Sequence, residues 1–489
     1  MNDTDKSLEN AVQVCRERNI IIPTYEEMAQ PETIPSGIIE ELSQIGLWDI
    51  HPRNLFRISW KNEPVEEGGG FKSVNALEIP SSLSGVKARV ILLLGKFFPT
   101  GSHKVGATFG PLVEKLIQGE FDPTRQKALW PSTGNYCRGG AYDSLLLGCS
   151  SVAVLPEGMS KERFEWLRKM GAEIHATPGT ESNVKEVYDK SYELKRERPD
   201  EIVIFNQFEE FGNSLWHYVN TGRAIEELYE ELKEPGQKLS ALFLTQGSAG
   251  TLGSADYLRE KYPLIKVGAG EAIQCPTLLY NGYGEHRIEG IGDKHVPWIH
   301  NLKNMDLVAG IDDVHCMRLV RLFNERFGQD YLVSTGIPTE VVDHLKLLGI
   351  SGLANLIGAV KTAHYFEFDE KDIVFSVCTD SMDLYRSRLA ELRMDHGEYS
   401  EIQAAVDFES CLIGQKTDHV LELSYRDKKR MHNLKYFTWV EQLGKDVAEL
   451  DRQWSDDSYW TEKYSAHRIW DDKIREFNVR TGLLSQYSR

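Results

Sequence analysis

The sequence predicts an α/β protein with twisted parallel β-sheets that are flanked by helices. Between about residues 86 and 380, short apolar or β-branched runs alternate with segments of helical spacing. The apolar runs are almost continuous, which is typical of strands that are buried on both faces. The alternation indicates parallel sheets, because each crossover to the next parallel strand needs a connection long enough to hold a helix.

The elements can be assigned in order along the chain. The predicted strands are the runs KARVILLLG, KALWP, SSVAVLP, AEIHATP, EIVIFNQF, LSALFLTQG, IKVGAGEA and KDIVFSVCTD. The helices between them are predicted near residues 103–118 and 135–147, and in SKERFEWLRKMG, VKEVYDKSYELKRERP, NSLWHYVNTGRAIEELYEEL and AGTLGSADYLREKYP. In SKERFEWLRKMG, we expect Ser160 to be the N-cap and Gly171 to follow the last turn.

Composition and charge narrow the class of protein. The chain has 489 residues, of which 27% are charged, as in an ordinary globular protein. Its net charge of −18 argues against nucleic acid or an anionic membrane as a partner. No run approaches the roughly 18–20 apolar residues that span a bilayer, and the first residues lack an apolar signal segment. Seven scattered cysteines without a CxxC motif are typical of a reducing compartment, so a cytoplasmic location is expected.

One strand-to-helix loop places a lysine in an unfavourable position. Ligands of an open parallel sheet bind beyond the carboxyl ends of the strands, where such loops lie. The segment PTGSHKVGAT puts Lys104 in the first turn of a helix. The positive end of the helix dipole disfavours a cation there by roughly 0.3–1 kcal/mol. Lys104 is therefore either a solvent-exposed side chain or not an ordinary ammonium.

Three further loops offer anion receptors and a hydroxyl group. The segments PSTGNY (131–136) and QGSAGTLG (246–253) place small residues and glycines at helix starts, where backbone N–H groups bind anions. TDS (379–381) follows the last strong strand. Two anion receptors, one lysine and one hydroxyl suit an enzyme that uses pyridoxal 5′-phosphate. No metal-ligand spacing is present among the histidines, so no metal is predicted.

The order of these segments resembles that of the tryptophan synthase β and cysteine synthase-like pyridoxal phosphate enzymes, called fold type II. The resemblance covers roughly residues 85–390. SHK (102–104) resembles the Schiff-base segment, STGN (132–135) the substrate-carboxylate loop, GSAGT (247–251) the phosphate loop with alanine where glycine is usual, and EGIG (289–292) the mobile segment near the cofactor. Further matches in the same order are Gln207-Phe208, Asn213, His217-Tyr218, Thr221-Gly222, Gly349-Ile350-Ser351-Gly352 and Asp380-Ser381.

The resemblance implies a two-domain fold with additional terminal segments. We expect an N-terminal arm and lead-in (1–85), a large cofactor-binding α/β domain (86–124 and 216–390), a smaller mobile α/β domain (125–215) and a helical C-terminal extension (391–489). The extension is polar and rich in tryptophan. It is predicted to pack over the main body or over a second subunit, and the resemblance implies a homodimer.

The resemblance also implies the roles of the site residues. Lys104 would form the Schiff base and act as the catalytic base. The residues expected to bind the cofactor are Lys104, His103, Asn135, Gly247, Ser248, Ala249, Gly250, Thr251 and Ser381. Those expected to bind the substrate are Ser132, Thr133, Gly134, Asn135 and Gln207. Ser381 is the predicted partner of the pyridine nitrogen, although Asp380 and Asp383 leave a carboxylate partner open.

The expected reaction is that of a lyase acting on a small amino acid. Removal of the α-proton and loss of a β-substituent would give an aminoacrylate, which water converts to a keto acid and ammonia. A β-replacement synthase similar to cysteine synthase and a non-catalytic cofactor-binding scaffold are the alternatives. The residue before the substrate loop is Pro131, where tryptophan synthase has an acidic residue, so synthesis of tryptophan is not predicted.

Overall fold

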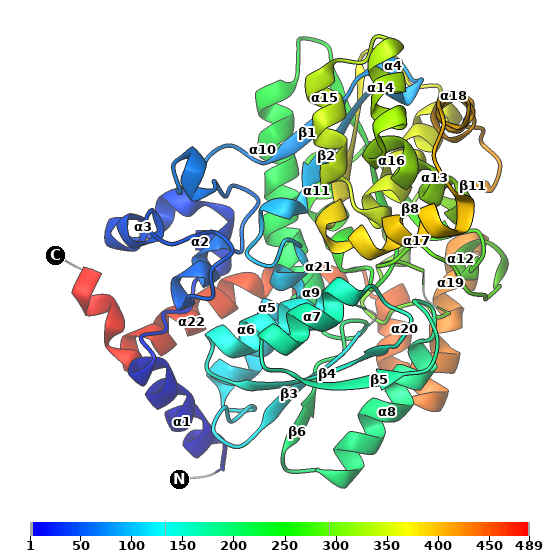
Figure 1. Ribbon diagram of the computed structural model, residues 1–489. Coiled ribbons are helices and arrows are strands. Elements are labelled where there is room, and N and C mark those ends of the chain that lie inside the picture. Colours follow the sequence, from blue (N-terminus) through cyan, green and yellow to red (C-terminus); the bar gives the residue numbers. More distant parts are fainter. Residues whose placement is uncertain (1–2, 133, 293, 488–489) are drawn as a thin grey trace.

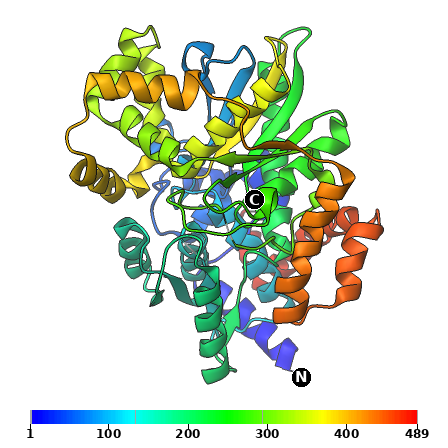
Figure 2. The same ribbon diagram turned by 90° about the vertical axis from the view of Figure 1, so that its right-hand side faces the viewer.

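The computed structural model describes residues 3–132, 134–292 and 294–487. It contains two β-sheets, both flanked by helices (Figure 1). The predicted α/β class with parallel sheets is confirmed. Figure 2 shows the two sheets one above the other, with the last helices of the chain (orange to red) on the right-hand side.

The larger sheet has seven strands. Its order is β1 (Ala76–Ile79), β2 (Arg89–Leu94), β10 (Asp372–Cys378), β7 (Lys238–Thr245), β8 (Lys266–Ala272), β9 (Leu307–Ile311) and β11 (Val420–Glu422). The five inner strands are parallel, and β1 and β11 pair antiparallel at the two edges. Every residue of β10 is buried, as expected for a strand between two neighbours with helices on both faces.

The smaller sheet has four parallel strands. Its order is β5 (Glu173–Thr177), β4 (Ser150–Pro156), β3 (Lys127–Pro131) and β6 (Ile202–Ile204). Its strands fall within the predicted smaller domain. The proposed domain boundaries themselves stay a prediction.

The helices predicted between the strands are present, and α12 to α16 are additional to that prediction. They are α5 (Lys104–Gln118), α6 (Asn135–Leu146), α7 (Lys161–Lys169), α8 (Val184–Glu197), α9 (Phe211–Trp216), α10 (Gly222–Leu232), α11 (Gly253–Lys261), α12 (Thr277–Tyr280), α13 (Asp313–Asn324), α14 (Arg326–Ser334), α15 (Thr339–His344) and α16 (Ile350–Tyr365). Helix α5 packs against α6 and α9 and so lies between the two sheets. A glycine is needed in this packing, because a Cβ at Gly106 would lie 2.1 Å from the ring of Trp216.

The terminal segments pack on the body of the same chain. The N-terminal arm contains α1 (Asp3–Glu17), α2 (Tyr25–Ala29) and α3 (Ser36–Leu42), and a short α4 (Ser81–Ser84) precedes β2. The C-terminal segment contains α17 (Arg386–His396), α18 (Glu401–Phe408), α19 (Tyr425–Lys435), α20 (Val447–Ser455), α21 (Tyr459–Ser465) and α22 (His467–Thr481). Helix α22 contacts α1, α2 and α5, so the two ends of the chain lie side by side (Figure 1).

Some local features differ from the sequence prediction. Strands β1, β9 and β11 were not predicted, and a π-helical turn (His217–Thr221) interrupts the expected long helix between α9 and α10. Ser160 does precede α7, but its side chain makes no capping hydrogen bond. Gly171 follows that helix with φ 73°, as predicted. Among the described helices, none is both long and apolar enough to span a bilayer.

Candidate active site

Lys104 is buried at the start of α5. The chain leaves β2, turns through Gly101 (φ 72°) and enters the helix at Lys104. Only 9% of the lysine surface is exposed, and its Nζ lies 3.2 Å from Oγ of Ser248. The solvent-exposed alternative is therefore wrong. Ser248 belongs to the predicted phosphate loop, so the fold brings two predicted segments together.

Residues 247–251 form a tight turn between β7 and α11. Ala249 adopts the left-handed conformation (φ 62°, ψ 7°), which normally favours glycine. Gly250 packs closely on Asn213, because a Cβ at Gly250 would lie 2.1 Å from Oδ1 of that residue. Asn213 in turn donates from Nδ2 to Oγ of Ser248 at 3.0 Å. A small-residue turn that contains a left-handed residue and leads into a helix exposes backbone N–H groups to an anion.

Lys104 and this turn line one small cavity. Its polar wall is formed by His103, Lys104, Thr245, Ser248, Thr251, Asn355 and Thr379. Gly290 and Ile291, from the predicted mobile segment, line it as well. The donor set fits pyridoxal phosphate, since a primary amine faces a glycine-rich anion turn and hydroxyl groups line the same space.

Thr379, and not Ser381, lies on this cavity. The Thr379 Oγ1 is 3.2 Å from Nε2 of His103. Ser381 lines a different hollow, and its Oγ lies 3.4 Å from Oδ2 of Asp383. The chain turns at the end of β10, so the structure does not bring Ser381 to Lys104. The sequence does not distinguish Thr379 from Ser381, because which hydroxyl lines the cavity depends on where β10 ends.

The two nearby carboxylates also point elsewhere. Asp380 accepts hydrogen bonds from Asn135 and Tyr385, and Asp383 pairs with Lys96 and Arg386. Neither lines the cavity that contains Lys104. A hydroxyl therefore faces the cavity at the end of β10.

His103 is fully buried behind Lys104. Its ring packs against the rings of Trp60 and His217, with centroids 5.6 and 4.9 Å away. Burial, together with the charge of Lys104, holds the pKa of His103 well below its usual range. A neutral imidazole thus supports the Thr379 hydroxyl.

The predicted substrate loop lies beside the cavity but does not line it in the part of the chain that the structure describes. Ser132 is buried, and its Oγ accepts from the backbone N–H of Gly134 at 3.0 Å. Thr133 lies outside the described residues. Asn135 begins α6 and donates to Asp380, and Gln207 is buried with its carbonyl accepting from Asn213 at 2.9 Å.

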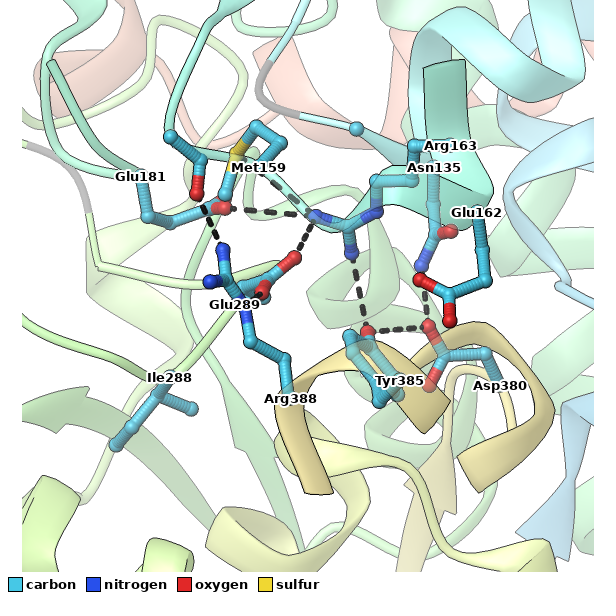
Figure 3. A network of polar contacts seen from close by, with 12 residues as sticks. Asn135, Met159, Glu162, Arg163, Glu181, Ile288, Glu289, Asp380, Tyr385 and Arg388 are labelled. Atoms are coloured by element: carbon cyan, nitrogen blue, oxygen red, sulfur yellow. Dashed lines mark hydrogen bonds and ion pairs between the residues drawn. The ribbon is translucent and has the colours of Figure 1, made fainter. Parts of the chain in front are cut away.

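A buried polar network joins this loop to the segment over the cavity (Figure 3). It connects Asn135, Asp380, Tyr385, Arg163, Glu289 and Arg388. Burial by itself would lower the pKa of Arg163, but the carboxylate of Glu289 raises it above its usual range. Sequence reasoning missed Arg163, Tyr385 and the buried role of Asp380, because no local pattern marks contacts between residues more than a hundred positions apart.

The parallel sheets, and the cavity where a buried lysine meets an anion-binding turn, point to the class of pyridoxal phosphate enzymes. A family model described as "Pyridoxal-phosphate dependent enzyme" matches residues 73–375, and the chain belongs to this family. Its cofactor is pyridoxal 5′-phosphate.

Individual proteins of known sequence or structure are also similar to this chain. A probable cysteine synthase of Bacillus subtilis is 30% identical over 227 residues, which cover 46% of this chain and 71% of that protein. A cystathionine β-synthase of Saccharomyces cerevisiae is 28% identical over 327 residues, 64% of this chain and 60% of that protein. Among solved structures, a cysteine synthase of Entamoeba histolytica has a TM-score of 0.56 at 22% identity, covering 69% of this chain and 92% of that one. A hydrogen sulfide-producing enzyme of Fusobacterium nucleatum has a TM-score of 0.53 at 23% identity, covering 71% and 95%. These structural likenesses concern the fold.

Proposed function

We propose that the protein removes the β-substituent of a small amino acid and joins a nucleophile to the same carbon, a β-replacement. The observation that carries this proposal is the position of Lys104 Nζ beside Ser248, in a cavity whose further wall holds the hydroxyl of Thr379. Relatives of similar sequence are named for the synthesis of cysteine and cystathionine, which both bear sulfur on the β-carbon.

The residues divide the work as follows. When bound, pyridoxal phosphate supplies an electron sink for the bonds of the substrate α-carbon. Residues 247–251 would hold the phosphate with backbone N–H groups, and Lys104 would hold the aldehyde carbon and carry the α-proton on Nζ during turnover. Residues 132–135 would hold the substrate carboxylate.

We propose Thr379 as the partner of the ring nitrogen, with Ser381 as the alternative that the sequence predicted. A hydroxyl is a weaker acid than a carboxylic acid, so it leaves the ring nitrogen less protonated. A pyridine ring that is less protonated would withdraw less electron density from the α-carbon. This favours loss of a β-substituent over racemisation.

The β-eliminating lyase predicted from the sequence shares the first half of this reaction. Elimination and replacement differ only in the step that follows loss of the β-substituent. Water completes elimination, whereas another nucleophile completes replacement. A panel of serine, cysteine, O-acetylserine, threonine and diaminopropionate tests both. Keto acid release that falls when a thiol, sulfide or indole is added, with a new amino acid formed, supports replacement. Keto acid release that ignores added nucleophiles supports elimination, and no turnover in the whole panel by cofactor-loaded protein contradicts both.

A homodimer and a small amino acid as the substrate are part of the same proposal. Sedimentation of the loaded protein tests the first, and the panel tests the second.

A further inference from the structure

A continuous chain of buried contacts runs from Glu289 to Asn135 (Figure 3). Glu289 is paired with Arg163 Nη1. Nη2 of the same arginine donates to the hydroxyl of Tyr385 at 3.0 Å, and that hydroxyl donates to Oδ2 of Asp380 at 2.7 Å. The same carboxylate oxygen accepts from Nδ2 of Asn135 at 2.5 Å. All five residues are buried.

The direction of each hydrogen bond in this chain is determined by chemistry. A guanidinium only donates, so the Tyr385 oxygen accepts from Arg163 and its own hydrogen is free to go to Asp380. The carboxylate then accepts on one side from tyrosine and on the other from the Asn135 amide. Because Asp380 accepts hydrogen bonds from both neighbours, it joins the arginine side of this hydrogen-bonded chain to the substrate loop.

Asp380 is an unusual residue to bury at this position. It is fully buried, and burial raises the pKa of its carboxyl, against the effect of the Tyr385 hydrogen bond and the charge of Arg163. Its other oxygen, Oδ1, has no hydrogen-bond partner among the described residues and packs on Gly349, where a Cβ would lie only 1.8 Å away. A buried carboxylate with an unpaired oxygen is costly, so its two remaining contacts have a reason to be retained.

The two ends of the chain lie on two different segments, the one over the phosphate turn and the predicted substrate loop. At one end, Glu289 belongs to the segment that covers the phosphate turn. In this segment, Gly292 N donates to the Gln246 carbonyl at 2.9 Å, and the Gly290 carbonyl packs on Gly247. At the other end, Asn135 directly follows residues 132–134. A Cβ at Gly134 would lie 2.5 Å from Cζ of Arg163, so the arginine also packs directly on this loop.

We propose that Asp380 is a positioning residue that couples the covering segment (residues 288–292) to the described residues of the substrate loop (Ser132, Gly134 and Asn135), so that these residues are held in their binding geometry only when Glu289 is seated on Arg163. The inference rests on the proposed function only in naming residues 132–135 as the site of the substrate carboxylate. The physical coupling is a property of the chain itself.

Hydrogen exchange of the cofactor-loaded protein tests the coupling without turnover. We expect Glu289→Gln to raise exchange in residues 132–137, and Asp380→Asn to raise exchange in residues 288–292, each by about twofold to thirtyfold, the range of coupling seen along connected networks. Asp383→Asn is the matched control, because Asp383 lies in the same loop but pairs with Lys96 and Arg386, which are outside the network. The proposal is overturned if Glu289→Gln raises exchange only in residues 288–292 and Asp380→Asn raises it only in residues 132–137.

Tyr385→Phe separates the two routes from Glu289 to the loop. It removes one hydroxyl and keeps the ring, so the fold is retained while the link between Arg163 and Asp380 is broken. In this background Glu289→Gln should add no further exchange in residues 132–137. An undiminished effect assigns the communication to the direct packing of Arg163 on Gly134 and refutes the role of Asp380.

Kinetics keep this inference distinct from the proposed function. If an amino acid of the panel is turned over, Asp380→Asn and Tyr385→Phe should raise its KM more than they lower kcat, and a loss in kcat alone would contradict the positioning role. If no amino acid is turned over, the proposed function fails while the exchange result still decides the coupling.

Discussion

The buried ion pair of Arg163 with Glu289 offers a quantitative test of how this site is held together. The arginine side chain has no exposed surface and that of the glutamate has 3%. Replacing Arg163 by Met leaves a buried carboxylate with only Arg388 as its partner, and breaking a buried pair in this way costs about 3–5 kcal/mol. For a chain of 489 residues, the entropy of unfolding is about 1 kcal/mol per kelvin, so Arg163→Met should lower Tm by roughly 3–5 °C.

Calorimetry on the wild type, Arg163→Met, Glu289→Gln and the double variant gives a complete cycle. The double variant should lose less than the sum of the single losses, because the second substitution neutralises the carboxylate that the first deprived of Arg163. Asp189→Asn is the control. Its partner is Lys185 on the surface of α8, and such an exposed pair should leave Tm unchanged. Losses that add within about 0.5 kcal/mol would refute the view that Arg163 and Glu289 depend on each other.

Three further predictions concern the cofactor site and stability. Thr379→Ala should shift the visible absorption of the bound cofactor and lower kcat/KM by about tenfold, the value of one hydrogen bond between neutral groups; a larger shift in Ser381→Ala would return the role to Ser381. Ala249→Val should weaken cofactor binding in a fluorescence titration and destabilise the fold by about 1–2 kcal/mol, because a branched side chain is strained at φ 62°, whereas equal affinity would show that the turn tolerates it. Burial lowers the pKa of His295 to about 3, so only the unfolded chain gains its proton below about pH 6.5, and stability falls by about 1.4 kcal/mol per pH unit. His295→Leu should reduce the pH dependence of the free energy of unfolding between pH 6.5 and 4. An unchanged pH dependence would contradict the lowered pKa of His295.

The fold was largely accessible from sequence because its signals are local. Apolar runs and helical spacing indicated the parallel strands and their crossovers, and small residues at helix starts indicated the loops around Lys104 and Ser248. The edge strands β1 and β11 have only four and three residues, so too little periodicity was present to predict them. The position of Thr379 depends on where β10 ends, which the sequence does not mark.

The buried network could not have been predicted in the same way. Arg163, Glu289 and Asp380 lie on separate elements, and nothing local in the sequence indicates that they belong to one network. Only the packing of α7 and α17 around the end of β10 brings them together (Figure 3). Charged side chains are rarely buried unless they are paired. Because the partners of these side chains lie far away in the sequence, their burial could not be predicted from the neighbouring residues.

The measurement that tests the account most directly is the site of covalent attachment of the cofactor. Borohydride reduction of the loaded protein, followed by digestion and mass mapping, should place the added mass on the peptide that contains residue 104. Lys435, the most deeply buried lysine of the described residues, donates to the carbonyls of Trp298 and His300, so it should stay unmodified. Label on Lys435 or another lysine, or none at all on a protein that binds the cofactor, would contradict the account.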